Sequence, residues 1–369
     1  MEASRSAPRP PVTRVRLVLV AVVTAACTQG SVSHVKAPPS VGSTTTTTTS
    51  TATATRAPRP HALGLAVVNL DGSVRRDLEL PPDAWMADLS PDGSHVAFLT
   101  RSPDTGTCGG CGPHDRLAVV QIGKRSGAYV YPDNGAFRRI EEPAWSPTGD
   151  RVAFVGVRSG GERDVFVATL TNRDDMPAGI LGAKVRRLTN DPAADEFPAW
   201  SPDGSTIFYD NAGDKAVDDS GFSPTQEIWS VPASGGAPRR LTHDRIADVQ
   251  PDVGPDGTLA YWHGGEIRVM DPSGSNQRRL QPIPHGLWFN PRWSPDGRSL
   301  ALLRFADDRA TFAPRRGVAD DLPLLEVVVV NLVTGKVKQV GPRVASDVNP
   351  VSWMPDGSAL LIDRFDDGA

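Results

Sequence analysis

A pattern of polar and apolar positions typical of a short β-hairpin recurs along the chain from residue 89 to residue 362. In each copy an aromatic or aliphatic residue precedes Ser-Pro-Asp-Gly or a close variant, and a short apolar run comes after it. Pro and Gly suit a tight turn, because Pro fixes φ and Gly can take a positive φ before the next strand. Each copy therefore predicts two short antiparallel strands. The six copies begin at Leu89, Trp145, Trp200, Val253, Trp293 and Trp353.

Two further alternating segments come after most of these hairpins. They are residues 164–168 and 186–189, 227–232 and 239–242, 266–270 and 278–280, and 324–331 and 337–340. The repeating unit is thus predicted to hold four antiparallel strands. Four-stranded units repeated around an axis form a β-propeller, which protects sheet edges by radial repetition.

The two ends of the pattern indicate how the ring closes. Two strand-like segments, 64–70 and 74–78, precede the first hairpin, whereas the sixth hairpin has no further strands after it. We therefore expect an all-β, six-bladed β-propeller closed by N-terminal strands that complete the last blade. A pair of β-sandwiches, the alternative architecture, would leave these end strands without partners.

The first residues have the order of a secretory signal. Four arginines precede an apolar stretch at 17–23, and Thr24-Ala-Ala-Cys27 comes next. This order resembles a bacterial lipoprotein lipobox, although Thr24 stands where the strongest form has Leu. The resemblance implies that residues 1–26 are a lipoprotein signal peptide and that Cys27 becomes a diacylated N-terminus, which anchors stably with two chains. An ordinary signal peptide with an incidental Cys27 is the alternative.

Residues 27–61 form a Thr/Ser/Ala/Pro-rich segment with six consecutive threonines at 44–49. Such a composition cannot bury a core, so we expect an extended linker, with or without glycosylation. The propeller is then expected to span 62–369. The formal net charge is −4, and this argues against nucleic acid as a partner, since phosphate binding needs clustered cations.

The Trp-Ser-Pro-Asp-Gly hairpin and the later Arg-Arg-Leu-Thr strand resemble the WD40-like (PD40) propeller repeat of the TolB-like family. The propeller halves of prolyl oligopeptidase and dipeptidyl peptidase IV relatives are similar too. The resemblance covers about residues 63–369. It implies fold more than function, because one fold hosts many functions.

Acidic and amide residues recur just before the predicted innermost strands, and the resemblance implies that this position lies near a mouth of the central channel. Two interpretations are open. The side chains form a funnel that binds a cation, a basic peptide segment or a polar ligand, or they bond backbone N–H groups of the next blade. The candidate binding residues are Asp88, Glu142, Asp195, Glu196, Asp248, Asn290 and Asp347.

Cys108 and Cys111 are expected to form a local disulfide, because an exported protein meets an oxidising compartment. A metal site with His114 and free thiols are the alternatives. His95 and His263 lie in predicted hairpins and are interpreted as structural. The tryptophans at 145, 200, 293 and 353 share one repeat position, which favours core packing.

These features favour a lipid-anchored, extracytoplasmic propeller that binds an envelope protein or cell-wall component. It is expected to be a monomeric scaffold without catalysis, cofactor or metal. The expectation that it is not an enzyme rests on the four residues after Phe365, where a hydrolase domain would need many more, and on the lack of a Gly-x-Ser-x-Gly elbow. The alternatives are a hydrolase or lyase acting on an envelope sugar or lactone, and a small-molecule sensor that uses the channel mouth.

Overall fold

The computed structural model defines most of the chain from residue 62 to residue 365. The residues it describes are 62–78, 80–81, 84–102, 114–123, 127–130, 137–158, 160–171, 179–181, 183–213, 226–244, 246–284, 288–305, 325–341 and 351–365. They form strands and turns and contain no helix. Within this described part there is accordingly no helix long and apolar enough to cross a membrane.

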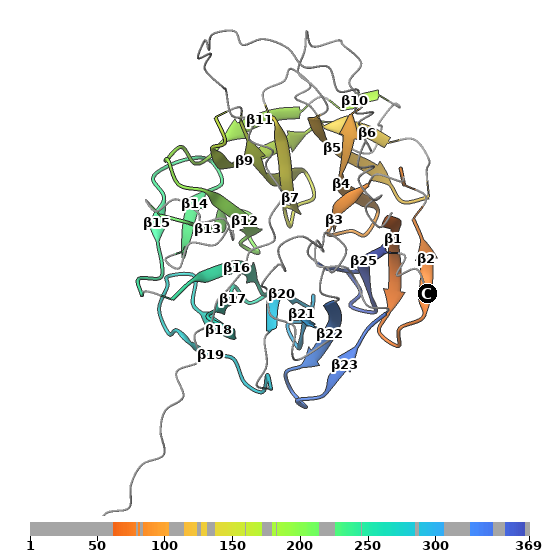
Figure 1. Ribbon diagram of the computed structural model, residues 1–369, viewed down its shortest axis with the longest axis vertical. Coiled ribbons are helices and arrows are strands. Elements are labelled where there is room, and N and C mark those ends of the chain that lie inside the picture. Colours follow the sequence, from red (N-terminus) through yellow and green to blue (C-terminus); the bar gives the residue numbers. More distant parts are fainter. Residues whose placement is uncertain are drawn as a thin grey trace, which may run out of the picture.

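Six sheets surround a central axis, and the strand that precedes the repeated Pro-Asp-Gly-type turn is the one nearest that axis in each sheet (Figure 1). Blade one has β3 (Trp85–Leu89), β4 (His95–Ser102), β5 (His114–Gln121) and β6 (Gly127–Val130). Blade two has β7 (Arg139–Trp145), β8 (Arg151–Val157), β9 (Arg163–Leu170) and β11 (Ala183–Arg187). Blade three has β12 (Asp195–Trp200), β13 (Thr206–Asn211), β14 (Glu227–Pro232) and β15 (Arg239–Arg240).

Blade four has β16 (Asp248–Val253), β17 (Leu259–His263), β18 (Glu266–Met270) and β19 (Arg278–Arg279). Blade five has β20 (Trp288–Trp293), β21 (Ser299–Phe305), β22 (Leu325–Asn331) and β23 (Val337–Gln339). Blade six joins both ends of the pattern: β24 (Ser352–Trp353) and β25 (Ala359–Phe365) pair with β1 (Ala62–Asn69) and β2 (Val74–Asp77). The predicted six-bladed propeller and its closure by N-terminal strands are confirmed.

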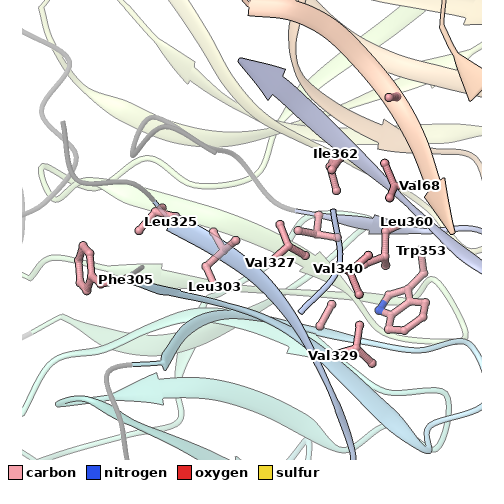
Figure 2. Packing of buried hydrophobic residues seen from close by; sticks show 13 residues of the cluster. Val68, Leu303, Phe305, Leu325, Val327, Val329, Val340, Trp353, Leu360 and Ile362 are labelled. Atoms are coloured by element: carbon pink, nitrogen blue, oxygen red, sulfur yellow. The ribbon is translucent and has the colours of Figure 1, made fainter. Parts of the chain in front are cut away.

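The closure is an antiparallel pairing backed by an apolar interface. β1 runs beside β25 from Ala62 opposite Phe365 to Asn69 opposite Ala359. Figure 2 shows Val68, Leu360 and Ile362 of blade six against Val327 and Val340 of blade five. These side chains are buried, so the closing blade is part of the hydrophobic core.

Blade one differs from the predicted four antiparallel strands. A fifth strand, β10 (Gly179–Leu181), pairs in parallel with β6, so that Gly179 lies opposite Ala128. β10 belongs to the connection between β9 and β11 of blade two. An outermost strand has unpaired N–H and C=O groups along its edge, and β10 supplies partners for those of β6.

Side chains of the Arg-Arg-Leu-Thr segment bind the outer strand of a blade to the third strand of the same blade. Its second arginine forms an ion pair with the acidic residue near the start of the third strand, as in Arg187 with Asp164 and Arg240 with Glu227. The threonine hydroxyl accepts a backbone N–H of that same strand, which is Ile228 N at 2.9 Å for Thr242. The repeated motif is therefore explained by strand pairing within the blade.

Gly156 provides a test of how tightly the blades pack. A Cβ at this position would lie 2.5 Å from Phe137 Cε1 and 2.7 Å from Phe166 Cε2. Rings held in a core cannot move aside freely, so Gly156→Ala should lower the free energy of unfolding by about 1–3 kcal/mol in urea titrations. Gly160→Ala is the control, because its Cβ would meet the carboxylate end of the Glu162 side chain, and it should change stability by less than about 0.5 kcal/mol. Equal stability of the two variants would contradict close packing of the two rings on Gly156.

Candidate functional site

Among the described residues, five inner strands contain a bulge with a left-handed residue at the same repeat position. These residues have φ between 50° and 56°, and most of them precede a proline. Each non-glycine residue held in this region costs about 1–3 kcal/mol, so the surrounding contacts must maintain it. The residues are Met86, Glu142, Phe197, Gln250 and Asn290.

The left-handed residues give their backbone N–H groups to side chains of the preceding blade. Phe197 N donates to Glu142 Oε2, and Asn290 N donates to Gln250 Oε1 at 2.8 Å. Gln250 N donates to Asp210 Oδ2 at 2.8 Å, because Phe197 has no acceptor in its side chain. These bonds form a first ring around the channel.

A second ring lies further along the inner strands, next to the repeated aromatic position. Asp88 Oδ2 accepts Trp145 N at 2.8 Å, and Asp252 Oδ2 accepts Trp293 N at 2.6 Å. Ser352 Oγ accepts Leu89 N at 3.1 Å across the closing joint. Here too the side chain of one blade satisfies the backbone of the next.

The repeated tryptophans complete the contact between blades. Trp145 Nε1 donates to Asp88 O at 3.1 Å, and Trp200 Nε1 donates to Ala144 O at 3.0 Å. Trp353 Nε1 donates to Arg292 O at 3.0 Å. These indoles are largely buried between blades, yet they also line the central cavity.

The central cavity has a volume of about 420 Å³ and is lined in part by the Ser-Pro turns. Each blade contributes to the wall the residue that directly precedes the repeated aromatic or aliphatic residue, and these residues differ in polarity from blade to blade. Ala144 and Ala199 make the side of blades two and three apolar. The polar side is formed by Ser352, Asp88, Asp252 and Arg292 from blades six, one, four and five.

Among the described residues that line this cavity, Arg292 is the one with a positively charged side chain. Within the described part of the chain its polar contacts both involve Nη1, with Pro291 O at 3.3 Å and Asp252 Oδ1 at 3.8 Å. A guanidinium has five N–H donors, so most of the donors of Arg292 remain available to a ligand. The carboxylates on the wall, by contrast, already accept backbone N–H groups.

Burial raises the pKa of the three wall carboxyls, and the nearby charge of Arg292 partly offsets this. For Glu142 the combination of burial and the neighbouring Glu141 raises the pKa to about 8. The pKa values of Asp88 and Asp252 are also raised. A carboxyl with a pKa near neutrality can hold or release a proton at physiological pH.

The structure separates the candidate residues predicted from the sequence into distinct environments. Asp88 and Glu142 line the cavity, and Asn290 joins the first ring through its backbone. Asp195, Glu196 and Asp248 are buried at the starts of inner strands and do not line it. Asp195 contacts Asn211, Glu196 forms an ion pair with Arg163, and Asp248 contacts His263. The predictions for Cys27, Cys108, Cys111 and Asp347 lie outside the described residues.

Sequence reasoning missed Arg292 and Asp252. The sequence did contain a signal for both, because each directly precedes the repeated aromatic or aliphatic residue, as Asp88 does. Comparison of that one position across the six repeats would have revealed two acids and one arginine at equivalent places.

No family model matches the chain. An uncharacterized protein, Atu1656 of Agrobacterium fabrum, is 26% identical over 265 residues, which cover 61% of this chain and 85% of that protein. The uncharacterized peptidase YuxL of Bacillus subtilis is 25% identical over 191 residues, covering 44% of this chain and 28% of YuxL. Dipeptidyl-peptidase 5 of Arthroderma otae is 24% identical over 264 residues, covering 56% of this chain and 36% of that enzyme.

The solved structures show the same fold. A putative TolB from Agrobacterium tumefaciens superposes with a TM-score of 0.57 at 18% identity, covering 82% of this chain and 97% of that one. TolB from Acinetobacter baumannii gives a TM-score of 0.51 at 17% identity, covering 74% of this chain and 64% of that one. The chain has the TolB-like propeller fold.

The comparisons contradict the expectation that the protein is not an enzyme, because curated relatives are named as peptidases. That expectation relied on the small number of residues after Phe365, and the position at which a sequence ends does not decide its activity. The chain spans about a third of the length of these two peptidases, or less.

The raised pKa of Glu142 predicts a pH dependence of stability. Between the ordinary value of 4.5 and about 8, the folded state holds a proton that the unfolded state has lost. Stability therefore falls as the pH rises through this window, by up to about 1.4 kcal/mol per pH unit for one group. Glu142→Gln keeps an acceptor for Phe197 N and should flatten this slope in urea titrations across the window.

The control for this experiment is Glu162→Gln, which neutralises a carboxylate whose side chain is 51% exposed. This variant should keep the slope of the unaltered protein. An unchanged slope in Glu142→Gln would show that Glu142 is ionised in the folded state throughout the window.

Proposed function

We propose that the protein binds a segment of another polypeptide in its central cavity, with a carboxylate of that segment bound to Arg292. The observation that carries this proposal is a guanidinium with unused donors on the wall of a cavity of about 420 Å³. Arg recognises carboxylates through paired, charge-assisted hydrogen bonds. The apolar side, formed by Ala144, Ala199 and the tryptophans, suits the apolar side chains of such a segment.

The bonding of the wall carboxylates supports this choice over a basic ligand. Asp88 accepts hydrogen bonds from Trp145 N, Leu89 N and Ser352 Oγ, so that few of its lone pairs remain. Glu142 and Asp252 each accept a backbone N–H as well. A cationic ligand would compete with bonds that join adjacent blades, whereas a carboxylate on Arg292 would not.

Polypeptide is favoured as the ligand class by the names of the relatives, since peptidases act on polypeptides. The predicted signal segment and Cys27 support a location outside the cytoplasm, with the propeller attached to a membrane by lipid. The partner in that setting would be an envelope protein.

Short N-acetylated peptides with free C-terminal carboxylates test the proposal. Tryptophan fluorescence should report their binding, because several indoles line the cavity. Arg292→Gln should weaken binding about tenfold or more, because it removes a charge-assisted hydrogen bond. Amidated forms of the same peptides should bind as weakly to the unaltered protein as the free acids bind to the variant.

Arg298→Gln is the matched control, because Arg298 is exposed on a turn beside the cavity and does not line it. It should leave binding unchanged. Equal affinity of the Arg292 and Arg298 variants for the free acids would refute a role for Arg292, and a folded protein that binds none of the peptides would refute the proposal.

Peptide hydrolysis by the chain itself is a second candidate function, favoured by the peptidase names among the relatives. No histidine lies among the described residues of the cavity wall, so a serine triad is not formed by them. Glu142, with its pKa of about 8, would then act as the general acid or base. Mass spectrometry of the same peptides would detect cleavage, which Glu142→Gln should abolish.

A further inference from the structure

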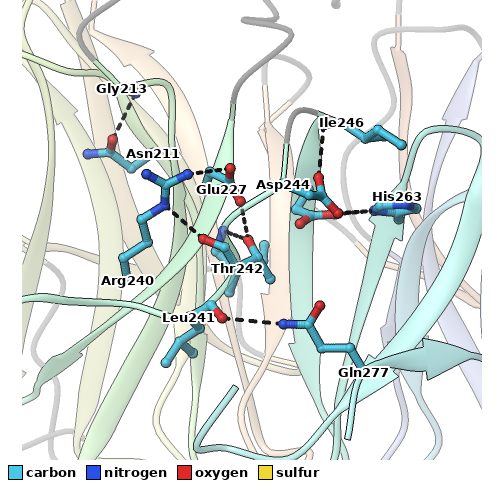
Figure 3. Close-up of polar contacts among 12 residues, drawn as sticks. Asn211, Gly213, Glu227, Arg240, Leu241, Thr242, Asp244, Ile246, His263 and Gln277 are labelled. Carbon is cyan, nitrogen blue, oxygen red and sulfur yellow. Dashed lines mark hydrogen bonds and ion pairs between the residues drawn. The ribbon is translucent and has the colours of Figure 1, made fainter. Parts of the chain in front are cut away.

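A second chemical cluster lies away from the central cavity, where blade four begins. Asp248 is the first residue of β16, His263 is the last residue of β17, and the two are paired across the sheet. Asp244 belongs to the connection that leads into β16. Figure 3 shows Asp244 and His263 pointing toward one another from these two elements.

The three side chains converge on one small volume. His263 Nδ1 lies 2.6 Å from Asp248 Oδ1 and 3.8 Å from Asp244 Oδ2. One ligand atom from each residue lies within 4.8 Å of the other two. Ligands bound to a single ion at about 2.0–2.2 Å lie roughly 3–3.6 Å apart, so a small side-chain rotation would bring all three onto one ion.

An independent observation shows that the cluster is incompletely satisfied. The side chain of Asp248 is 1% exposed, yet its Oδ2 atom is buried without a hydrogen-bond partner among the described residues. The neighbouring Thr242 has a single hydroxyl hydrogen, which goes to Glu227 Oε2 at 2.6 Å. A buried carboxylate oxygen without a partner is unfavourable, and a bound cation would offset this cost.

The contacts around the cluster determine which of its atoms remain for an ion. Glu227 lies close by, but Arg240 and Thr242 already occupy its two oxygens. Asp244 Oδ1 accepts Ile246 N at 2.8 Å, which fixes the loop and leaves Oδ2 for the cluster.

We propose that Asp244, Asp248 and His263 form a binding site for a divalent transition-metal ion such as Zn²⁺ or Mn²⁺. One imidazole and two carboxylates are ligands that these ions accept, whereas Ca²⁺ and Mg²⁺ favour oxygen alone. The side chain of Asp244 is 43% exposed, so an ion can enter from solvent and keep a coordination position for water or a ligand. The site is distinct from the central cavity, whose wall includes none of these residues.

Metal titration of the full chain tests this site. The protein is purified with Cys27, Cys108 and Cys111 changed to Ser, so that thiolates cannot bind the ion, and is stripped with a chelator. Calorimetric titration with Zn²⁺ and with Mn²⁺ should show one ion per chain. His263→Gln, Asp248→Asn and Asp244→Asn should each weaken binding at least about tenfold, since even outer-shell changes have effects of that size.

Matched controls separate this site from general affinity for metals. His243→Gln removes an exposed imidazole of the same loop, and Glu266→Gln removes a carboxylate whose side chain is 42% exposed at the adjacent hairpin. Both variants should bind like the unaltered chain. The metal should also raise the melting temperature of the unaltered chain and of the two controls, but not that of the cluster variants.

Asp244→Asn keeps the test decisive if the buried variants fail to fold, because Asp244 is partly exposed. Normal affinity in a folded Asp244→Asn or His263→Gln protein would overturn the proposal. Failure of the folded, stripped chain to bind Zn²⁺ or Mn²⁺ would overturn it as well, and so would equal binding of Ca²⁺ that does not depend on His263.

Discussion

An inner strand of a propeller has a hydrogen-bonded neighbour on one edge only, and its other edge faces the channel. The N–H groups on that free edge must still be paired, because burying them without a partner costs free energy. In this protein the side chains of the preceding blade provide the acceptors, as Glu142 does for Phe197 N and Asp252 does for Trp293 N. The left-handed residues belong to the same arrangement: the bulge that they form turns selected N–H groups toward the preceding blade. Blade packing, backbone strain and the polarity of the channel wall therefore have one origin.

This constraint determines what the wall can offer to a ligand. A carboxylate that accepts a neighbouring N–H joins two blades, so its presence in the channel is not evidence of an acidic binding funnel. Asp88 illustrates this, because both of its oxygens have partners on adjacent blades. Arg292 occupies an equivalent position, yet a guanidinium has no acceptor and cannot play that part. Its backbone carbonyl accepts the indole N–H of Trp353, as the carbonyl of Asp88 accepts that of Trp145, and its side chain lines the cavity.

The sequence was sufficient to predict the blades, because each strand depends on a local turn and on alternation of apolar side chains. The third strands of blades three and four, β14 and β18, coincide with the predicted segments 227–232 and 266–270. β10 could not be predicted in the same way, since its partner β6 belongs to another blade and the pairing depends on tertiary proximity. For the site, the repeat led to Asp88 and Glu142, but acidity alone did not distinguish residues on the wall from Asp195 and Glu196 behind it. That distinction depends on which side chain the neighbouring strand presents, and a periodic pattern does not specify this.

The starts of the inner strands show how one repeat position can acquire different chemistry. Asp195 and Asp248 both begin an inner strand and both face the last residue of the second strand, which is Asn211 in blade three and His263 in blade four. An amide opposite the acid gives a hydrogen-bonded pair, and burial then raises the pKa of Asp195 to about 8. An imidazole opposite the acid provides a second metal ligand, and Asp244 adds a third from a partly exposed loop. Blade four thus combines a structural acid of the repeat with two residues of its own, so a ligand site can arise there without altering the contacts that hold the ring together.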